Sequence, residues 1–204
     1  MASLRLNDCG TCFVLAQHQL TPARRIGRGQ FCAVYDDGPE AVIKLTTDSI
    51  QLESVRDYLI GPHFPKMLDN YGYVGEQYSG ELSLLMFKSE RLNPTRMADL
   101  PTKRLVKKVM RSVDRYWCSN ETIKRSSAKH SNTARLVSRT EATLEQLIED
   151  QELPASVREA FEDLLRMAMD YQNIVLDMHG ANLMVRGADE LIFNDVVVTG
   201  ELLG

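Results

Sequence analysis

The chain has 204 residues, of which 44% are hydrophobic and 25% are charged, a balance typical of a globular protein. Its net charge of −4 argues against nucleic-acid binding by the chain as a whole, and it contains no apolar run of membrane-spanning length. Four cysteines are too few for a disulfide framework, and the first residues lack the apolar core of a signal peptide. We therefore expect one domain, or two small lobes, in a reducing cytoplasm.

The first half of the chain is dominated by short β-type runs. Residues 1–22 have a mixed composition and are expected to form a peripheral cap. Predicted strands follow at 25–28, 33–36, 41–45, 71–76 and 82–87. The last of these runs is nearly all apolar, which is typical of a strand buried on both faces. Asp48 and Ser49 favour the start of a helix that continues to about Leu59.

The second half is predicted to be mainly helical. Apolar residues recur at helical spacing after Pro101, and further helices are expected at 138–148 and 155–171. Short strands are predicted at 174–176, 183–185 and 191–193. The serine-rich stretch 126–138 is expected to be a mobile loop. The pattern indicates an α+β protein with an N-terminal cap at 1–22, a β-rich lobe at 23–88 and a helical lobe at 89–204.

Positive charge is concentrated in one segment, from Lys103 to Arg139. Eleven lysines and arginines and two acidic residues give it a formal charge of +9, so the rest of the chain carries −13. We call residues 102–139 the basic insert. It suits a solvated helix face, docking on a protein partner or contact with nucleic acid. Hydroxyl residues within it are candidate autophosphorylation sites: Ser126, Ser127, Ser131, Thr133 and Ser138.

Two glycines stand between the first two predicted strands, at Gly27 and Gly29. Glycines in such a loop let backbone amides approach phosphate groups closely, and Phe31 beside them can fold over the phosphates. A plain hairpin with glycines at its turn explains the same residues. The glycines alone therefore leave both interpretations open.

Lys44 ends an apolar strand, which is an unusual place for an ammonium group. In a phosphate site such a lysine binds the α- and β-phosphates and pairs with a carboxylate on a helix. Glu53 on the following helix is the expected partner, with Asp57 as the substitute. A strand-end lysine that reaches solvent is the structural alternative.

A polar cluster near the C-terminus contains the remaining candidate site residues. Asp177 can accept a proton from a substrate hydroxyl, while Asn182 and Asp195 can hold Mg²⁺ against ATP phosphates. His179 lies where a cationic group could reach the transferred phosphoryl. Turn formation, or a satisfied loop histidine, explains each residue singly. The order of this cluster after Gly27, Gly29 and Lys44 favours the active-site interpretation.

The motifs at 27–35 and 42–44, with Asp177, Asn182 and Asp195, resemble the protein-kinase signature set. More closely, 31–35, 42–44 and 176–184 resemble the early serine/threonine kinase family of autographivirus bacteriophages, along residues 24–198. The resemblance implies a minimal two-lobed protein-kinase-like fold with a truncated C-terminal lobe, and ATP and Mg²⁺ as cofactors. It places the nucleotide on Gly27, Gly29, Phe31, Val34, Lys44, Glu53 and Met86.

The same resemblance implies an early viral enzyme acting in the host cytoplasm. It would phosphorylate host proteins, including transcription machinery such as RNA polymerase and RNA-processing machinery, and promote shutoff of host transcription. Two other functions fit the residues. A kinase-fold binding protein could block RNA polymerase or another host partner without catalysis, and a small-molecule phosphotransferase shares the pattern of His179 two positions after Asp177.

The sequence departs from typical protein kinases in several places. Cys32 replaces the third glycine of the loop, and Val175-Leu176 replaces the usual His-Arg, so we expect no control by activation-loop phosphorylation. Asp195 is followed by Val196-Val197 instead of Phe-Gly. Only nine residues follow Asp195, and they hold no Ala-Pro-Glu motif. We therefore expect either that other surfaces bind a peptide substrate or that catalysis on proteins is inefficient.

Cys9 and Cys12 form a C-x-x-C pair, which suits a redox pair or half of a zinc site. No second C-x-x-C follows. Incidental cysteines in the N-terminal cap are therefore the expected interpretation.

Overall fold

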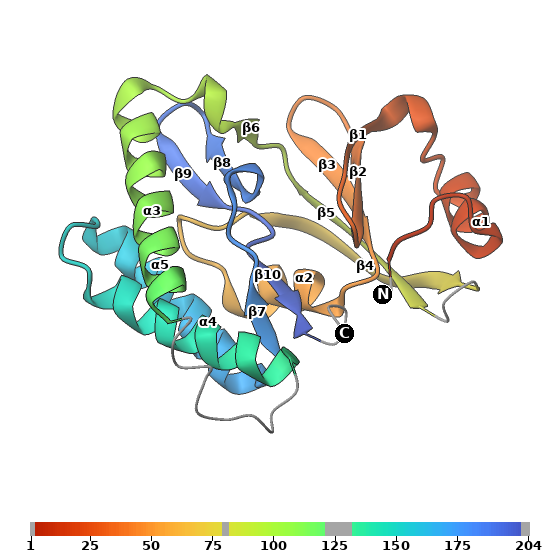
Figure 1. Ribbon diagram of the computed structural model, residues 1–204. Coiled ribbons are helices and arrows are strands. Elements are labelled where there is room, and N and C mark those ends of the chain that lie inside the picture. The colour runs from red at the N-terminus through yellow and green to blue at the C-terminus, as the bar shows by residue number, and fades with distance from the viewer. Residues whose placement is uncertain (1–2, 79–81, 121–131, 201–204) are drawn as a thin grey trace. The chain divides into compact units, whose positions relative to one another are not determined.

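The computed structural model describes residues 3–78, 82–120 and 132–200 (Figure 1). Its architecture is α+β, as predicted: a five-stranded antiparallel sheet is followed by helices and small sheets. The chain divides into two compact units. The first unit comprises Met1–Arg56 and Lys66–Arg91, and the second comprises Asp57–Pro65 and Leu92–Gly204.

The first unit is built on a sheet with strand order β1-β2-β3-β5-β4, in which every neighbouring pair is antiparallel. The strands are β1 (Arg25–Arg28), β2 (Cys32–Asp36), β3 (Ala41–Thr46), β4 (Met67–Gln77) and β5 (Leu82–Glu90). All five predicted strands are confirmed, and β4 and β5 are longer than predicted. Each gain in length adds backbone hydrogen bonds within a ladder, which the side-chain pattern does not report.

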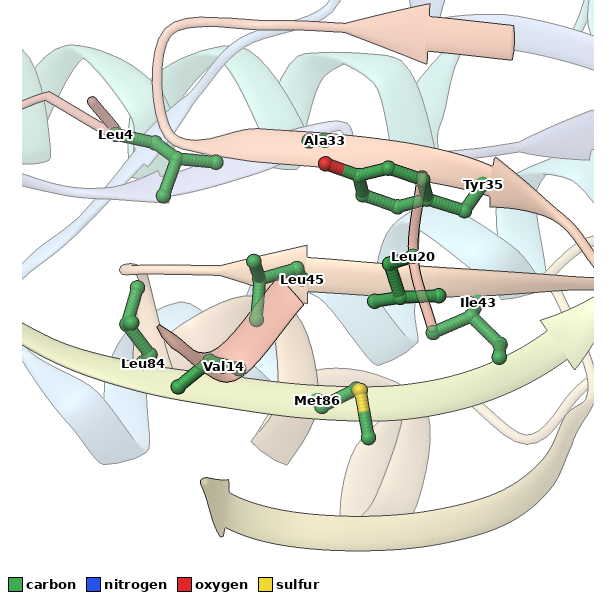
Figure 2. Close-up of a cluster of buried hydrophobic side chains, with 9 residues drawn as sticks. All are labelled: Leu4, Val14, Leu20, Ala33, Tyr35, Ile43, Leu45, Leu84 and Met86. Carbon is green, nitrogen blue, oxygen red and sulfur yellow. The ribbon is translucent and has the colours of Figure 1, made fainter. Parts of the chain in front are cut away.

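One face of this sheet carries the main hydrophobic cluster of the first unit (Figure 2). Alternate residues of the strands point to it, as expected from the two-residue period of a strand. The cluster contains Leu4, Val14, Leu20, Ala33, Tyr35, Ile43, Leu45, Leu84 and Met86. Its first three members come from the N-terminal segment, which was expected to be a peripheral cap. That segment therefore supplies core side chains to the sheet.

The N-terminal segment contains helix α1 (Cys9–Gln17) and a 3₁₀ turn (Pro22–Arg24). Asp8 caps α1 by accepting a hydrogen bond from the Gly10 N–H at 3.0 Å. The helix packs closely on β4, since a Cβ added at Gly10 would lie only 1.9 Å from the Glu76 carbonyl oxygen. A glycine at this position is what permits the close approach.

The opposite face of the sheet is covered by helix α2 (Ser49–Glu53) and the start of a π-helical turn (Ser54–Tyr58). The predicted cap is confirmed, because the Asp48 carboxylate accepts a hydrogen bond from the Ile50 N–H at 3.0 Å. Leu52 and Val55 pack against Phe87. The predicted helix is therefore present, but its second half is wider than an α-helix.

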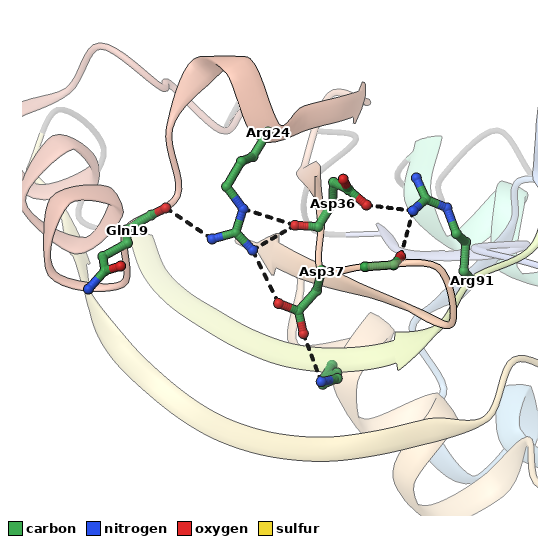
Figure 3. Close-up of polar contacts among 7 residues, drawn as sticks. Gln19, Arg24, Asp36, Asp37 and Arg91 are labelled. Atoms are coloured by element: carbon green, nitrogen blue, oxygen red, sulfur yellow. Dashed lines mark hydrogen bonds and ion pairs between the residues drawn. The ribbon is translucent and has the colours of Figure 1, made fainter.

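A polar network fixes the turn between β2 and β3 (Figure 3). Arg24 donates to the Asp36 carbonyl and pairs with the Asp37 carboxylate at 3.1 Å. Lys88 pairs with the other Asp37 oxygen at 2.7 Å, and this hydrogen bond is the main reason that the pKa of Asp37 is lowered. Arg91 binds the Asp36 carboxylate and the Gly38 carbonyl. The network ties the turn to the N-terminal segment and to the end of β5.

Three helices form the bulk of the second unit: α3 (Leu100–Ser119), α4 (Asn132–Glu149) and α5 (Ala155–Tyr171). The prediction for α5 is confirmed at both ends. The expected loop at 126–138 is wrong for residues 132–138, which belong to α4, and residues 126–131 lie outside the described ranges. Within residues 3–78, 82–120 and 132–200, no helix has the length and apolar character needed to cross a membrane.

The second unit also holds the short predicted strands. β7 (Ile174–Leu176) pairs antiparallel with β10 (Val197–Thr199). A separate sheet has the order β6 (Asn93–Pro94), β8 (Leu183–Arg186) and β9 (Glu190–Phe193). The predicted strands at 174–176, 183–185 and 191–193 are all confirmed. β8 and β9 form the hairpin between Asn182 and Asp195.

Residues 57–65 also belong to the second unit, and this segment is hydrogen-bonded to the β8–β9 hairpin. The buried His63 ring approaches the Leu191 carbonyl oxygen at 2.7 Å and the Ser156 hydroxyl at 3.0 Å. Arg186 donates to the carbonyl oxygens of Pro62 and Phe64, each at 2.9 Å. These bonds fix the position of β8 and β9, and therefore of the polar residues at their ends.

Candidate active site

The predicted site residues fall into two groups, one in each unit, which we call the first and second half-sites. The first half-site lies in the β1–β2 hairpin of the first unit. Gly27 is opposite Val34 in the ladder, and the Gly29 N–H donates to the Cys32 carbonyl at 2.8 Å. Neither glycine has a positive φ. A Cβ at Gly27 would meet Val34 at 3.5 Å, and one at Gly29 would come no closer than 3.9 Å to the Cys32 oxygen. The hairpin itself therefore does not require glycine at either position.

Four residues of this unit lie in one row across the sheet. Gly27 is paired with Val34, Val34 with Lys44, and Lys44 with Phe87. Residues directly opposite each other in an antiparallel sheet point to the same face. The structure therefore brings Gly27, Val34 and Lys44 together on one face.

Lys44 is almost completely buried, with 3% of its surface exposed. Its Nζ lies 5.8 Å from the centre of the Phe87 ring, within the range of a cation–π interaction. A buried ammonium loses hydration and binds anions strongly, because the local dielectric is low. The alternative of a lysine that extends into solvent does not hold for Lys44.

The expected ion pair between Lys44 and Glu53 is not formed. Within the described part of the chain, Glu53 makes no ion pair at all. Leu52 and Val55 are the residues of this helix that face the sheet. Glu53 follows Leu52 by one position, which rotates it by about 100° around the helix axis and away from that face. The helix is present as predicted, but this carboxylate lies away from its sheet-facing side.

Two other predicted nucleotide-binding residues lie differently from expectation. The Phe31 ring is buried, and the Phe31 carbonyl accepts hydrogen bonds from Thr46 Oγ at 3.0 Å and the Thr47 N–H at 2.9 Å. Met86 points into the cluster of Figure 2, on the sheet face opposite Lys44. The next residue, Phe87, is the one that shares the face of Lys44.

The second half-site begins directly after β7 in the second unit. Asp177 follows this strand, and its N–H donates to the Val196 carbonyl at 2.8 Å, which extends the β7–β10 pairing. The strand is anchored from α4, because Thr140 Oγ accepts the Leu176 N–H at 2.9 Å. The Asp177 carboxylate is half exposed, so a substrate hydroxyl can reach it.

Asn182 connects the parts of this half-site. Its Nδ2 donates to the Asp177 carbonyl at 2.8 Å and to the Asp195 carbonyl at 2.9 Å. Only the NH₂ group of an amide can bind two carbonyl oxygens, so the orientation of the side chain follows from its partners. The amide oxygen therefore points elsewhere, and it accepts no hydrogen bond from any described residue. It is available as a metal ligand.

Asp195 has a left-handed backbone conformation, with φ of 54°. A non-glycine residue in this region is uncommon, and such strain often occurs at functional sites. The buried Asn194 holds the conformation from two sides. Its Nδ2 donates to Asp195 Oδ2 at 3.1 Å, and its N–H donates to the Asn182 carbonyl at 2.8 Å. Sequence reasoning missed Asn194, although its position next to Asp195 was a usable signal.

His179 lies beside the proposed base. Its Nε2 is 3.8 Å from Asp177 Oδ2, and both side chains are about half exposed. Its Nδ1 accepts the Ala181 N–H at 3.3 Å, so a neutral His179 carries its proton on Nε2. The ring thus presents an N–H next to the Asp177 carboxylate.

The donor set of the second half-site suits a hard cation. Within the described ranges, no group of three His, Cys, Asp or Glu residues forms a metal site. Asp195 and Asn182 instead provide one carboxylate and one amide oxygen. Mg²⁺ commonly uses only one or two protein oxygens and takes its remaining ligands from water and substrate phosphates. The residues therefore fit a magnesium–nucleotide complex better than a dedicated metal site.

A comparison of the sequence with protein-family models finds no match, and a comparison with curated proteins finds none. Function is therefore inferred from the geometry of the two half-sites.

Proposed function

We propose that this chain is an ATP- and Mg²⁺-dependent serine/threonine protein kinase with a minimal two-lobed protein-kinase-like fold. As the sequence resemblance implies, its substrates are host proteins of an infected bacterium, and its action promotes host transcription shutoff. Gly27, Gly29 and Lys44 hold the phosphates. Asn182 and Asp195 hold Mg²⁺, which when bound neutralises charge on the phosphates.

The observation that carries this proposal is the bridging position of Asn182. One amide nitrogen binds the backbone on both sides, at Asp177 and Asp195, and leaves the amide oxygen for a cation. A turn-forming asparagine has no need to join two segments thirteen positions apart in the chain. These bonds join Asp177, Asn182 and Asp195, which supports the proposal because phosphoryl transfer uses one base and two metal ligands of these residue types.

Asp177 and His179 would have separate roles in the transfer. The Asp177 carboxylate orients the substrate hydroxyl and accepts its proton as the hydroxyl oxygen bonds to the γ-phosphorus. The bond from that phosphorus to the β–γ bridging oxygen breaks, and ADP leaves. His179, with its N–H beside Asp177, can donate to a phosphoryl oxygen.

The test is incubation with γ-labelled ATP and Mg²⁺, with and without bacterial lysate. We expect label on protein with the wild type and a loss of at least about 100-fold in Asp177→Ala and Asp195→Ala. Asp189→Ala is the matched control, because Asp189 is an exposed carboxylate of the same unit outside the half-site. Transfer that persists in both site variants would contradict the assignment.

A small-molecule phosphotransferase is the second candidate, favoured by the exposed His179 beside Asp177. It predicts label in a small product and none on protein. A binding protein without catalysis predicts no transfer in any fraction. It is favoured by the basic surface of α3.

A further inference from the structure

The exposed side of helix α3 carries a row of cations. Lys107, Arg104 and Arg111 are exposed, and Lys103 and Lys108 are half exposed. Thr102, Val109, Ser112 and Val113 are the buried residues of the same helix. At about 100° per residue, the five cations fall on the side opposite these buried positions. We call Leu100, Lys103, Arg104, Lys107, Lys108 and Arg111 the α3 basic face.

Within the described part of the chain, none of these five cations forms an ion pair, although the charge of Lys103 acts on the nearby Asp99 carboxylate. The ion pairs found there involve other groups, such as Arg115 with Asp150 at 2.7 Å. Asp114 is the one acidic residue of α3, and it follows the face by one turn. Five like charges on one helix side repel each other and weaken the helix slightly. A partner of opposite charge would remove that cost.

Two exposed apolar side chains stand at the N-terminal end of the face. Leu100 is 61% exposed and occupies the same helix side as Lys103, Arg104 and Lys107, at the i+3, i+4 and i+7 spacing. Met97, in the 3₁₀ turn Thr95–Met97 just before α3, is 57% exposed. The face thus combines positive charge with an apolar end.

We propose that the α3 basic face is a docking surface for an acidic polypeptide segment that carries an apolar side chain. Acidic side chains pair with the cations, and the apolar side chain covers Leu100 and Met97. From Leu100 to Arg111 the face extends about 17 Å on an ideal helix. Docking on this face does not require phosphoryl transfer.

A nucleic acid fits this face less well. Single strands are bound through exposed aromatic side chains as well as cations. The aromatic residues of α3 are already covered by arginines, since Arg115 lies 4.4 Å from the Tyr116 ring centre and Arg139 lies 4.0 Å from that of Trp117. The charge of −13 on the rest of the chain also repels a long polyanion.

The probe is a fluorescently labelled synthetic peptide of aspartates and glutamates around one leucine, and binding is followed by anisotropy without nucleotide. We expect the double variant Lys107→Glu, Arg111→Glu to bind at least about tenfold more weakly, because attraction becomes repulsion at two positions. Arg5→Glu with Lys66→Glu is the matched control, since both residues are exposed and the change in net charge is the same. The control should change affinity less than about twofold.

The apolar end has a separate test. Leu100→Ser should weaken binding of the leucine peptide about threefold or more and leave a peptide with serine in its place unaffected. Circular dichroism melts will show whether each variant is folded. The proposal is overturned if wild type does not bind the peptide, if the control loses as much affinity, or if an RNA oligonucleotide of equal charge binds more tightly.

Discussion

Asn182 and Asn194 show how two amides set the geometry of the second half-site. Asn182 joins the Asp177 and Asp195 carbonyls, and Asn194 binds the Asp195 carboxylate and the Asn182 carbonyl. Asn182 thus fixes the backbone of Asp177 and Asp195, and Asn194 fixes the Asp195 carboxylate and the backbone of Asn182. Asp195 can keep its positive φ because these bonds offset the cost of about 1–3 kcal/mol.

Asn194→Ala should therefore reduce magnesium affinity without removing a ligand. We expect the Mg²⁺ concentration for half-maximal activity to rise about 10–100-fold, as for other residues that orient a metal ligand. Saturating Mg²⁺ should restore most of the activity. Asn93→Ala is the control, because this variant loses a similar side-chain hydrogen bond, from Asn93 Nδ2 to the Gly187 carbonyl at 3.1 Å. An unchanged Mg²⁺ midpoint in Asn194→Ala would refute the positioning role.

At the scale of elements, strand register decides which residues share a face. The pairings Val34 with Lys44 and Lys44 with Phe87 put these residues on the phosphate-facing side of the proposed site, and Met86 on the other. Helix packing decides the rest. The contact of Leu52 and Val55 with Phe87 fixes the rotation of α2 and turns Glu53 away from Lys44.

The close packing of α1 on β4 gives a prediction about stability. In Gly10→Ala the new Cβ would meet the Glu76 carbonyl oxygen at 1.9 Å, so helix and strand must separate. We expect the free energy of unfolding to fall by about 1–3 kcal/mol in urea titrations. Gly29→Ala, where no atom lies closer than 3.9 Å, should change it by less than about 1 kcal/mol. Equal effects in the two variants would argue against this packing.

Asp150 follows α4 directly and joins α3 to the turn between α4 and α5, and its contacts predict a pH dependence of stability. Its Oδ2 accepts from Ser112 Oγ at 2.8 Å and from Arg115 at 2.7 Å, and its Oδ1 accepts from the Glu152 N–H at 3.0 Å. Burial by itself raises the pKa of Asp150, but these hydrogen bonds and the Arg115 charge outweigh it and lower the pKa. The folded protein therefore holds the Asp150 proton less tightly than the unfolded chain does.

It follows that the stability from Asp150 is complete above the unfolded pKa of about 4 and is lost as pH falls through the lower folded pKa. Asp150→Asn should lower the free energy of unfolding by about 1–2 kcal/mol at pH 7, since Arg115 is half exposed and screened. The difference between wild type and variant should shrink below pH 4 or so. Asp163→Asn, which removes a surface pair with Arg166, should change stability by less than about 0.5 kcal/mol. A pH-independent difference for Asp150→Asn would contradict the assignment.

For the whole molecule, the proposed function requires that the chain bind a nucleotide together with Mg²⁺. A ligand that binds only the folded protein raises its stability by mass action. We therefore expect ADP with Mg²⁺, at about 100 times its dissociation constant, to add about 2.7 kcal/mol and to raise the melting temperature.

The same thermal measurement separates the contributions of the half-sites. Asp195→Ala should remove the dependence of this shift on Mg²⁺. Asp189→Ala, in the same unit, should retain it. A melting temperature that does not respond to nucleotide in the wild type would count against both half-sites at once.

The α+β class and most of the helices and strands could be predicted from the sequence, because strand and helix periods are local properties of the chain. The exceptions include α1, β6 and β10. The order of polar residues along the chain also predicted a site at Lys44, Asp177, Asn182 and Asp195, and their chemical roles stay predictions. Other features depend on tertiary contacts. Glu53 and Met86 lie on other faces than their expected roles require, and Leu4 and Leu20 belong to the core. The bond from Asn194 to Asp195 is also seen only in the structure. Register, helix rotation and side-chain hydrogen bonds arise from contacts between distant segments, and no local pattern encodes them.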